Sequence, residues 1–326
     1  MVTSNNNSSL TSCVGKTDKD TTIAEIQSIP RWHFAMLNDH QRNQAFFDAI
    51  EATDFVGKTV LDIGTGTGLL AMLIARRGAQ HVYTCECNEL VAEKAKEIIK
   101  ANGLQERITV INKLSTDLLS GIDIPKELDV LVSETVDCGF FGEGFGYALL
   151  HAQSNLLKAD AEIIPGAVSL TACLLSSQEV ANLNYIYDDI FGLDVSAFNS
   201  FRTQGYFPVR LNTWEHRLIS NAVDLYESSF YTGFSFNTAE QIIFSAQANA
   251  LAHGVVFWFN LKLKDDIVLS NDPHNPRSHW MQAVHLFEHP VYVRRGHDYQ
   301  VDLSISPKGV KFSDSLMASV LENIAS

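Results

Sequence analysis

Residues 60–70 constrain the fold of this 326-residue chain more than any other stretch. They read VLDIGTGTGLL, an apolar run followed by three alternating glycines and the start of an apolar helix pattern. A buried strand, a glycine turn and a helix in this order are typical of a parallel α/β sheet. Glycine has no Cβ, so the chain can turn tightly there and a ligand can lie against the backbone.

The spacing of the glycine turn also predicts a kind of ligand. Asp62 precedes Gly64, Gly66 and Gly68 in a GxGxG pattern, whereas dinucleotide binders use GxGxxG. This variant suits an adenosyl ligand that carries an amino acid group and no pyrophosphate, and it therefore favours S-adenosylmethionine. A glycine turn with a purely structural role is the alternative.

Strand and helix patterns alternate after the turn and predict a Rossmann-like, doubly wound sheet with right-handed crossovers. Functional side chains then gather at the carboxyl ends of the strands. Glu86 lies at such an end, about twenty residues past the turn, where an acid can accept hydrogen bonds from ribose hydroxyls; a solvent-exposed strand end is the alternative. Ser115, after the next strand, would face the adenine. The predicted strands are 59–63, 81–85, 108–112 and 130–133, and the predicted helices are 69–77 and 90–101.

The composition changes after Pro165, where β-branched and aromatic residues become frequent. This change predicts a second, antiparallel β domain, a barrel or a sandwich. We therefore expect a flexible tail at 1–22, a ligand-binding domain at 23–165 that begins with a helical stretch broken at Pro30, and a β domain at 166–326 with an inserted arm at about 182–227. The predicted β strands are 168–175, 242–246, 255–263, 283–287 and 299–305.

Charge and cysteine content narrow the possible partners and the cellular location. The net charge is −14, and the chain lacks the basic stripes of nucleic-acid binders, so we expect no nucleic-acid partner. No apolar run reaches the roughly 18 residues of a membrane helix, and none is expected. The five cysteines are too scattered for a disulfide framework, which favours the cytoplasm. We expect no metal site, because four histidines show no ligand spacing with Cys, Asp or Glu: His151, His253, His274 and His285.

Glu134 and Glu143 flank a glycine-containing turn after the fourth predicted strand. A carboxylate pair at the ligand-binding edge can serve as general acid and base, or can bind a cation. A planar guanidinium would relieve the repulsion of the two acids by pairing with both at once. In the alternative, one glutamate is exposed and the other caps a helix that begins near Gly144.

Several of these segments, in one order from about residue 31 to 313, resemble the protein arginine methyltransferase family. The matching pieces are the glycine turn, Glu86, the double-glutamate hairpin, the Ser278-His279-Trp280 sequence and the HxxMLxDxxR element at 33–42. The stretches 111–116 and 142–144 look most like the monomethylating, type III branch. That branch often carries two modules in tandem, whereas this chain has one.

The resemblance implies transfer of a methyl group from S-adenosylmethionine to the guanidinium of arginine, in a homodimer joined by the arm. It implies that Arg42 pairs with the methionine carboxylate of the cofactor and that Met36 limits the number of methyl groups added. The implied cofactor residues are Arg42, Asp62, Gly64, Thr65, Gly66, Gly68, Glu86, Ser115 and Glu134. The implied catalytic residues are Glu134, Glu143, His279 and Asp39. The implied acceptor-binding residues are Glu134, Glu143, Met36, His33 and Trp280.

This chain also departs from the family pattern in the acceptor region. A serine replaces the usual threonine at Ser278, the tyrosine-rich helix ahead of His33 is absent, and residues 135–141 differ from peptide-binding versions of the loop. The acceptor can therefore be arginine in a protein or peptide, free arginine or a small guanidine. Two further hypotheses remain: methylation of another cationic amine, and a scaffold that binds the cofactor without catalysis.

Overall fold

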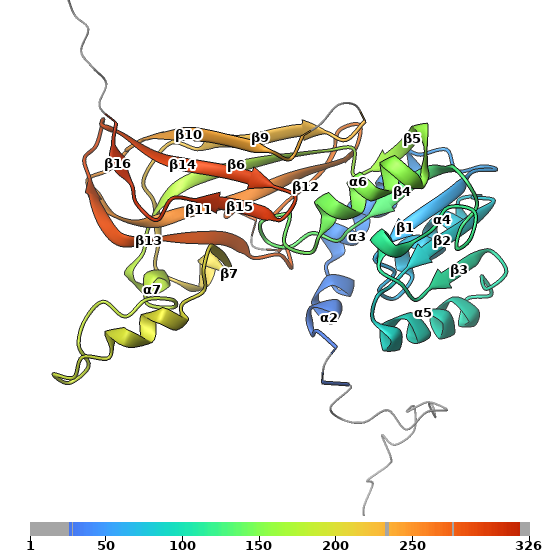
Figure 1. Ribbon diagram of the computed structural model, residues 1–326, viewed down its shortest axis with the longest axis horizontal. Coiled ribbons are helices and arrows are strands. Elements are labelled where there is room, and N and C mark those ends of the chain that lie inside the picture. Colours follow the sequence, from blue (N-terminus) through green and yellow to red (C-terminus); the bar gives the residue numbers. More distant parts are fainter. Residues whose placement is uncertain (1–25, 28, 232–234, 276, 320–326) are drawn as a thin grey trace, which may run out of the picture.

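The computed structural model describes residues 26–27, 29–231, 235–275 and 277–319 (Figure 1). It has two parts, a helical and parallel-sheet domain followed by a domain of antiparallel strands, as Figure 1 shows. The tail expected at 1–22 lies outside the described residues. None of the described helices is both long and apolar enough to span a membrane.

Five parallel strands in the order β3-β2-β1-β4-β5 form the first sheet. Ile63 lies opposite both Cys85 and Ser133, so the carboxyl ends of β1, β2 and β4 meet at one edge. The first two predicted strands match the observed ones, and β5 was not predicted from the sequence. The strands are β1 (Thr59–Ile63), β2 (His81–Cys85), β3 (Ile108–Ile111), β4 (Leu128–Ser133) and β5 (Leu157–Ile164).

The connecting helices form where apolar residues recur at helical spacing. Helix α4 (Leu69–Arg76) buries Leu70, Ala71, Ile74 and Ala75, a pattern with the period of one helix face. Helix α5 (Glu89–Ala101) begins where the Asn88 side chain accepts hydrogen bonds from the amides of Leu90 and Val91. Helix α6 (Phe145–Asn155) follows the double-glutamate turn.

The N-terminal stretch, expected to be helical to residue 53 with a break at Pro30, contains a second break. It forms α2 (Trp32–Leu37) and α3 (His40–Glu51), separated at Asp39. Asp39 has an extended backbone, and its Oδ1 accepts a hydrogen bond from the Arg42 amide at 2.9 Å. A capping carboxylate favours a helix start at this point. The described stretch is therefore largely helical, as expected, with a second break that was not predicted.

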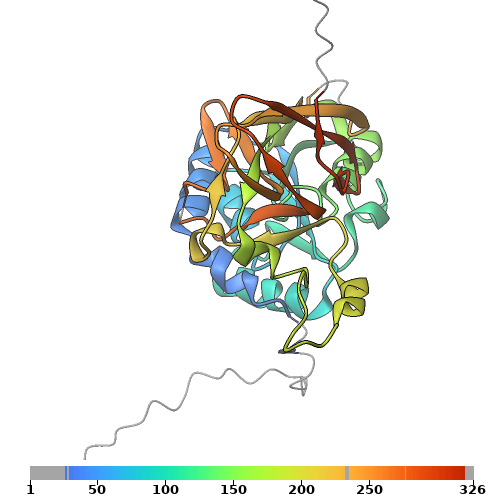
Figure 2. The same ribbon diagram turned by 90° about the vertical axis from the view of Figure 1, so that its left-hand side faces the viewer.

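The second domain consists of two antiparallel sheets, as expected (Figure 2). The larger is built on β6 (Ala167–Ser176), β11 (Ala250–Lys264) and β13 (Gln282–Val293), with β12 (Ile267–Ser270) paired to β11. The smaller contains β10 (Thr238–Ser245), β14 (Asp298–Ser306), β15 (Gly309–Phe312) and β16 (Met317–Ala318). The ring centroids of Phe257 on β11 and Phe312 on β15 are 5.5 Å apart, which places aromatic side chains between the sheets.

The arm is shorter than the predicted 182–227. Residues 182–205 project from the β domain between α7 (Gln178–Ala181) and β7 (Tyr206–Val209), and they include the 3-10 helix η2 (Ser196–Phe201) (Figure 1). After residue 205 the chain returns to the large sheet. There β7 pairs with β13, and both β8 (Arg217–Leu218) and β9 (Val223–Ser229) pair with β6. These short strands carry mixed polar and aromatic residues, which hid their pattern in the sequence.

Candidate active site

The glycine turn lies at the shared edge of β1, β2 and β4. Gly64, Gly66 and Gly68 have φ values of +87°, +50° and +78°, which L side chains rarely adopt. The amides of Gly64 and Thr65 donate to the Cys85 carbonyl oxygen at 3.1 and 3.0 Å, so the turn is attached to the end of β2. The three glycines are therefore required by the backbone itself.

Asp62 lies beneath this turn and is only 1% exposed. Its Oδ2 accepts a hydrogen bond from Thr84 Oγ1 at 2.7 Å, whereas its buried Oδ1 has no hydrogen-bond partner among the described residues. Burial raises the pKa of Asp62 to about 7, against the hydrogen bond from Thr84 and the charge of Arg42. A buried carboxylate oxygen without a donor fits a ligand that brings one, such as an ammonium group.

Glu86 follows β2 and bonds to the turn. Its Oε2 accepts a hydrogen bond from the Gly66 amide at 3.1 Å, and its Oε1 accepts one from the Asn88 amide at 3.0 Å. These contacts exclude a free, solvent-exposed strand end. They fix the carboxylate beside the glycine turn and leave lone pairs that can accept ribose hydroxyls. Ser115 lies after β3 in the 3-10 helix η1 (Ser115–Asp117), half-buried, and its adenine role stays a prediction.

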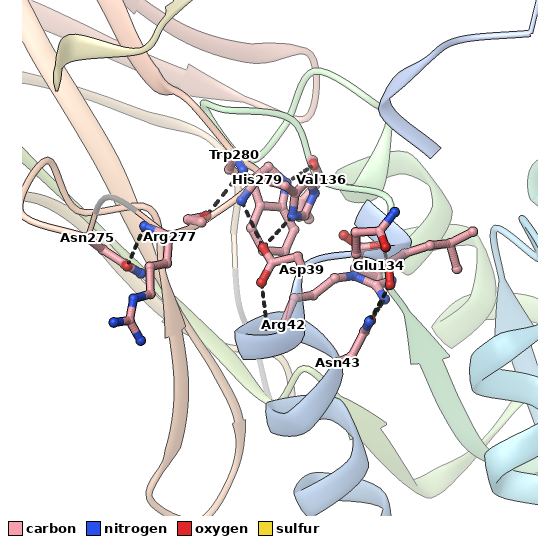
Figure 3. A network of polar contacts seen from close by, with 12 residues as sticks. Asp39, Arg42, Asn43, Glu134, Val136, Asn275, Arg277, His279 and Trp280 are labelled. Atoms are coloured by element: carbon pink, nitrogen blue, oxygen red, sulfur yellow. Dashed lines mark hydrogen bonds and ion pairs between the residues drawn. The ribbon is translucent and has the colours of Figure 1, made fainter. Parts of the chain in front are cut away.

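Arg42 on α3 brings a buried guanidinium to the same edge (Figure 3). Its Nη2 lies 2.6 Å from Glu134 Oε2, and its Nη1 donates to Asn43 Oδ1 at 2.8 Å. The guanidinium carbon lies 5.2 Å from the centre of the Phe46 ring. Arg42 Nε is buried and has no hydrogen-bond partner among the described residues, so the guanidinium can still bind an anion.

Asp39 and His279, two catalytic residues that the family resemblance implies, contact each other in the structure (Figure 3). Asp39 Oδ2 accepts hydrogen bonds from the His279 amide and from His279 Nδ1, both at 2.8 Å. Burial by itself would raise the pKa of Asp39, but the hydrogen bonds from Arg42 and His279 lower it below its usual value. Burial lowers the pKa of His279 despite its contact with Asp39. The pair is therefore an ionised carboxylate and a neutral imidazole that carries its proton on Nδ1.

Trp280 supports the loop that carries the two glutamates. Its Nε1 donates to the Val136 carbonyl oxygen at 2.9 Å, and its ring meets Phe259 edge-on at a centroid distance of 5.3 Å. Trp280 is 7% exposed, so it lies behind the loop. Its predicted acceptor-binding role stays a prediction.

Glu143 lies at the far end of this loop, at the start of α6. The N-cap of α6 is Gly144, and no side chain caps the helix, which excludes the helix-capping alternative for Glu143. In the described part of the chain, no hydrogen bond or ion pair joins its carboxylate. Glu143 is exposed as a residue, yet partial desolvation of its carboxylate raises its pKa to about 7, with help from the charges of Glu134 and Asp137.

Met36 and His33 come from α2, at the side of the glycine turn. A Cβ placed on Gly66 would lie 3.9 Å from Met36 Cε, so Met36 contacts the space above the turn. His33 Nδ1 is buried without a hydrogen-bond partner in the described structure. Met36 is therefore placed where it could contact a ligand, and the roles of both residues stay predictions.

Two residues of the site were missed in the sequence. Asp137 and Tyr206 join through a 2.9 Å hydrogen bond from Tyr206 Oη to Asp137 Oδ2. Glycines two and five residues after Asp137 are a local signal, because an aspartate often accepts amides that follow it in a turn. No local signal connects Tyr206 to the loop, because 69 positions separate the two residues.

The described residues fit an adenosyl ligand with an amino acid group. Asp62 has an unsatisfied oxygen for an ammonium, Arg42 has an unsatisfied N–H for a carboxylate, and Glu86 is held beside the turn for a ribose. Across the described part of the chain, no cluster of three or more His, Cys, Asp or Glu side chains could hold a metal ion.

Comparison with known proteins gives the family. Residues 170–318 match the arginine methyltransferase oligomerization subdomain, and residues 38–136 match the ribosomal protein L11 methyltransferase family. An arginine N(omega)-methyltransferase of Streptomyces achromogenes subsp. streptozoticus is 46% identical over 270 residues, which cover 83% of this chain and 74% of that relative. This chain belongs to the protein arginine methyltransferase family.

Other members of the arginine methyltransferase family agree with this assignment. Protein arginine N-methyltransferase 9 of Mus musculus is 30% identical over 290 residues, covering 79% of this chain and 34% of that relative. The fold matches the Trypanosoma brucei PRMT1 enzyme–prozyme heterotetrameric complex with AdoHcy, with a TM-score of 0.75 and 23% identity over 90% of this chain and 95% of that one. It also matches Arabidopsis thaliana protein arginine methyltransferase 10, with a TM-score of 0.69 and 22% identity over 86% of this chain and 88% of that one.

These matches confirm the predicted family, the predicted fold class and the prediction of an S-adenosylmethionine-dependent methyltransferase. The same arginine methyltransferase relationship implies an oligomer, because the matched C-terminal region is the oligomerization subdomain of the family.

Proposed function

We propose that this methyltransferase adds one methyl group to a terminal guanidinium nitrogen of arginine, and that free arginine is its preferred acceptor. The observation that carries the proposal is the state of the two glutamates. Glu134 is paired with Arg42, whereas Glu143 has a raised pKa and no ion-pair partner among the described residues. An arriving cation would supply the partner that Glu143 lacks.

The charge balance of the site favours a cationic acceptor. Arg42 already neutralises Glu134, yet the negative charges of Glu134 and Asp137 still act on Glu143. A guanidinium presents a planar fork that matches carboxylate geometry, so it can contact both glutamates at once. An ammonium offers a compact point charge without this match. We therefore favour a guanidinium over the amine alternative.

S-adenosylmethionine supplies a methyl group on a positively charged sulfur. The contribution of this chain is to hold and polarise the acceptor. Glu134 and Glu143 would keep positive charge on the nitrogens they bind, which leaves the attacking nitrogen richer in electrons. Orientation of two reactants in one site is worth up to about 7–11 kcal/mol in favourable cases.

The proton of the attacking nitrogen becomes acidic once the methyl group has been added, because the guanidinium then carries additional positive charge. The site offers two proton acceptors. His279 holds its own proton on Nδ1 against Asp39, so its Nε2 has a free lone pair. Glu143 is the other acceptor, since its raised pKa makes it a better base than an ordinary carboxylate.

Transfer of a single methyl group is supported by Met36, which stands close to the glycine turn. Its side chain would fill space that a methylated guanidinium needs for a second transfer. The free-arginine acceptor is supported by the relative with 46% identity, which is named for arginine and not for protein arginine. The departures at Ser278 and 135–141 agree with an acceptor other than a protein tail.

We also propose that the enzyme forms a homodimer through the arm. Apolar side chains along residues 182–205 are exposed in one chain, and a second copy would cover them. The exposed apolar residues are Leu183, Ile190, Phe191, Leu193, Phe198 and Phe201. Light scattering at micromolar concentration tests this proposal, and a monomer would contradict it.

The cytoplasmic location stays a prediction.

A panel of acceptors tests the function. Free arginine, agmatine, an arginine-containing peptide and lysine are each incubated with enzyme and S-adenosylmethionine, and products are measured by mass spectrometry. We expect methylated arginine as the main product. Methylation of lysine alone would support the amine alternative. Binding of S-adenosylhomocysteine without transfer to any acceptor would support the scaffold.

A further inference from the structure

One short segment connects the two loops that carry the acceptor-side residues. We call residues 206–211 the brace, residues 134–143 the carboxylate loop and residues 277–281 the histidine loop. The brace begins with β7, directly after the arm, and runs antiparallel to β13 from Tyr206 opposite His285 to Val209 opposite Gln282. It therefore has a fixed register on the large sheet.

The first residue of the brace contacts the carboxylate loop. Tyr206 donates its hydroxyl proton to Asp137 Oδ2 at 2.9 Å. Asp137 Oδ1 in turn accepts the amides of Gly139 at 3.2 Å and Gly142 at 2.8 Å. Gly142 immediately precedes Glu143, so these hydrogen bonds fix the position of the backbone next to Glu143.

This contact leaves no room for larger residues. A Cβ on Gly139 would lie 2.5 Å from Tyr206 Cζ, and a Cβ on Gly142 would lie 2.2 Å from Asp137 Oδ2. Neither glycine has a positive φ, so close packing, and not backbone strain, accounts for their lack of a side chain. Burial raises the pKa of Tyr206, which keeps its hydroxyl protonated and able to donate.

The other end of the brace contacts the histidine loop. Arg210 Nη1 donates to the Ser278 carbonyl oxygen at 3.1 Å, and its Nη2 donates to the His279 carbonyl oxygen at 2.9 Å. A guanidinium fork on two successive carbonyls fixes the backbone at His279 more firmly than a single donor could. The brace also ends in a hydrogen bond from the Leu211 amide to Gln282 Oε1 at 3.2 Å.

We propose that Tyr206 and Arg210 are positioning residues, which hold Glu143 and His279 at a fixed separation from one segment, the brace. The inference rests on the proposed function, because it assigns these two residues to the acceptor side of that reaction. Their hydrogen bonds set the geometry of that side. A brace that only completes the sheet would affect stability and leave the kinetic constants for arginine unchanged.

Two conservative substitutions with matched controls test the proposal. Tyr206→Phe removes one hydroxyl, and Tyr231→Phe is its control, because Tyr231 donates to the Ile163 carbonyl oxygen away from the acceptor loops. Arg210→Lys breaks the fork, and Arg107→Lys is its control, because Arg107 donates to the Ala79 carbonyl oxygen. Kinetic constants for arginine and the Kd for S-adenosylhomocysteine are measured for all four variants.

We expect Tyr206→Phe to raise KM for arginine about tenfold, as for loss of one hydrogen bond to a charged group. We expect Arg210→Lys to lower kcat about tenfold, and Arg210→Met to lower it further, because lysine can still donate to one carbonyl. The Kd for S-adenosylhomocysteine should change less than about twofold throughout. If both variants match their controls in KM and kcat, the proposal is overturned. If Tyr206→Phe does not fold, Arg210→Lys decides.

A pH profile adds a readout that a purely structural role would not change. The charge of Asp137 helps to raise the pKa of Glu143. Asp137→Asn keeps an oxygen for the two glycine amides but removes that charge. We expect the acid limb of kcat/KM for arginine to move to lower pH, and an unmoved limb would count against the link between Asp137 and Glu143.

Hydrogen exchange separates failure of this inference from failure of the proposed function. Tyr206→Phe should speed exchange at the Gly139 and Gly142 amides, whereas Tyr231→Phe should not. If wild-type enzyme methylates no guanidine but this exchange pattern is found, the proposed function has failed and the brace stands. If wild-type enzyme methylates arginine and the exchange is unchanged, the brace has failed.

Discussion

The substitution Asp39→Asn tests the role of the Asp39–His279 pair. Asp39 Oδ2 accepts two hydrogen bonds from His279, at its amide and at Nδ1, and Oδ1 accepts the Arg42 amide. Asparagine caps helices about as well as aspartate, so α3 should still begin at His40. The side-chain NH2 of asparagine, however, is a donor. It would either oppose the N–H of the His279 amide, or it would donate to His279 Nδ1 and so move the ring proton to Nε2.

The expected loss of stability in Asp39→Asn follows from the two hydrogen bonds that His279 donates to the Asp39 carboxylate. Each is worth about 1.5–3 kcal/mol, and one of them can persist as a neutral bond. We expect the free energy of unfolding to fall by about 2–4 kcal/mol, and Tm by about 4–16 °C at 2–4 °C per kcal/mol. If Nε2 becomes protonated it can no longer accept a proton, so we expect kcat to fall by about 10²–10⁴-fold.

The assay compares Asp39→Asn with Asp48→Asn, a variant on the same helix at an exposed carboxylate that accepts a hydrogen bond from the Gln44 side chain. Thermal unfolding and steady-state kinetics with saturating S-adenosylmethionine are measured for both. The reasoning is refuted if Asp39→Asn keeps kcat within about twofold of Asp48→Asn while its Tm also matches.

Two further predictions concern titration. The pKa of Glu143 is raised to about 7, and it must be ionised to bind a guanidinium, so KM for arginine should fall as pH rises through about 7. Glu143→Gln should remove this dependence. The pKa of Asp62 is raised from 3.8 to about 7, so the folded state binds more protons between these values and loses stability as pH rises through them. Asp62→Asn should therefore raise Tm at alkaline pH while raising the Kd for S-adenosylhomocysteine about tenfold.

Each of the two titration predictions has a control variant at an exposed carboxylate. Glu240→Gln should keep the pH dependence of KM, and a wild-type KM that does not change between about pH 6 and about pH 8 would contradict the assignment to Glu143. Asp266→Asn should change neither Tm nor cofactor affinity. Lower stability of Asp62→Asn at alkaline pH, with unchanged affinity for S-adenosylhomocysteine, would show that Asp62 serves the fold alone.

The parts of the fold that the sequence predicted well are those set by local patterns. Strand β1, the glycine turn and α4 follow from an apolar run, three glycines and an apolar helix face. The second break in the N-terminal helix was missed because Asp39 is also held by His279, a residue 240 positions away. The end of the arm was misplaced because β8 and β9 have no clear strand pattern of their own in the sequence and are recognised by their pairing with β6.

The sequence predicted individual residues of the candidate site, but not the hydrogen bonds and ion pairs between them. The resemblance led to Arg42, Glu134 and His279, since each belongs to a recognisable motif. Sequence could not show that Arg42 pairs with Glu134, because that contact joins α3 to the residue after β4, 92 positions away. The Tyr206–Asp137 contact was missed for the same reason, because it depends on the path of the chain after the arm.

The position of the methyl group on the product tests the central claim most directly. Wild-type enzyme, Glu134→Gln and Glu143→Gln are each incubated with S-adenosylmethionine and free arginine, and the product is fragmented in a tandem mass spectrometer. We predict one methyl group on a terminal guanidinium nitrogen for the wild type and a large loss of turnover in both variants. A methyl group on the α-amino nitrogen, or near-normal turnover in both variants, would contradict a guanidinium bound between Glu134 and Glu143.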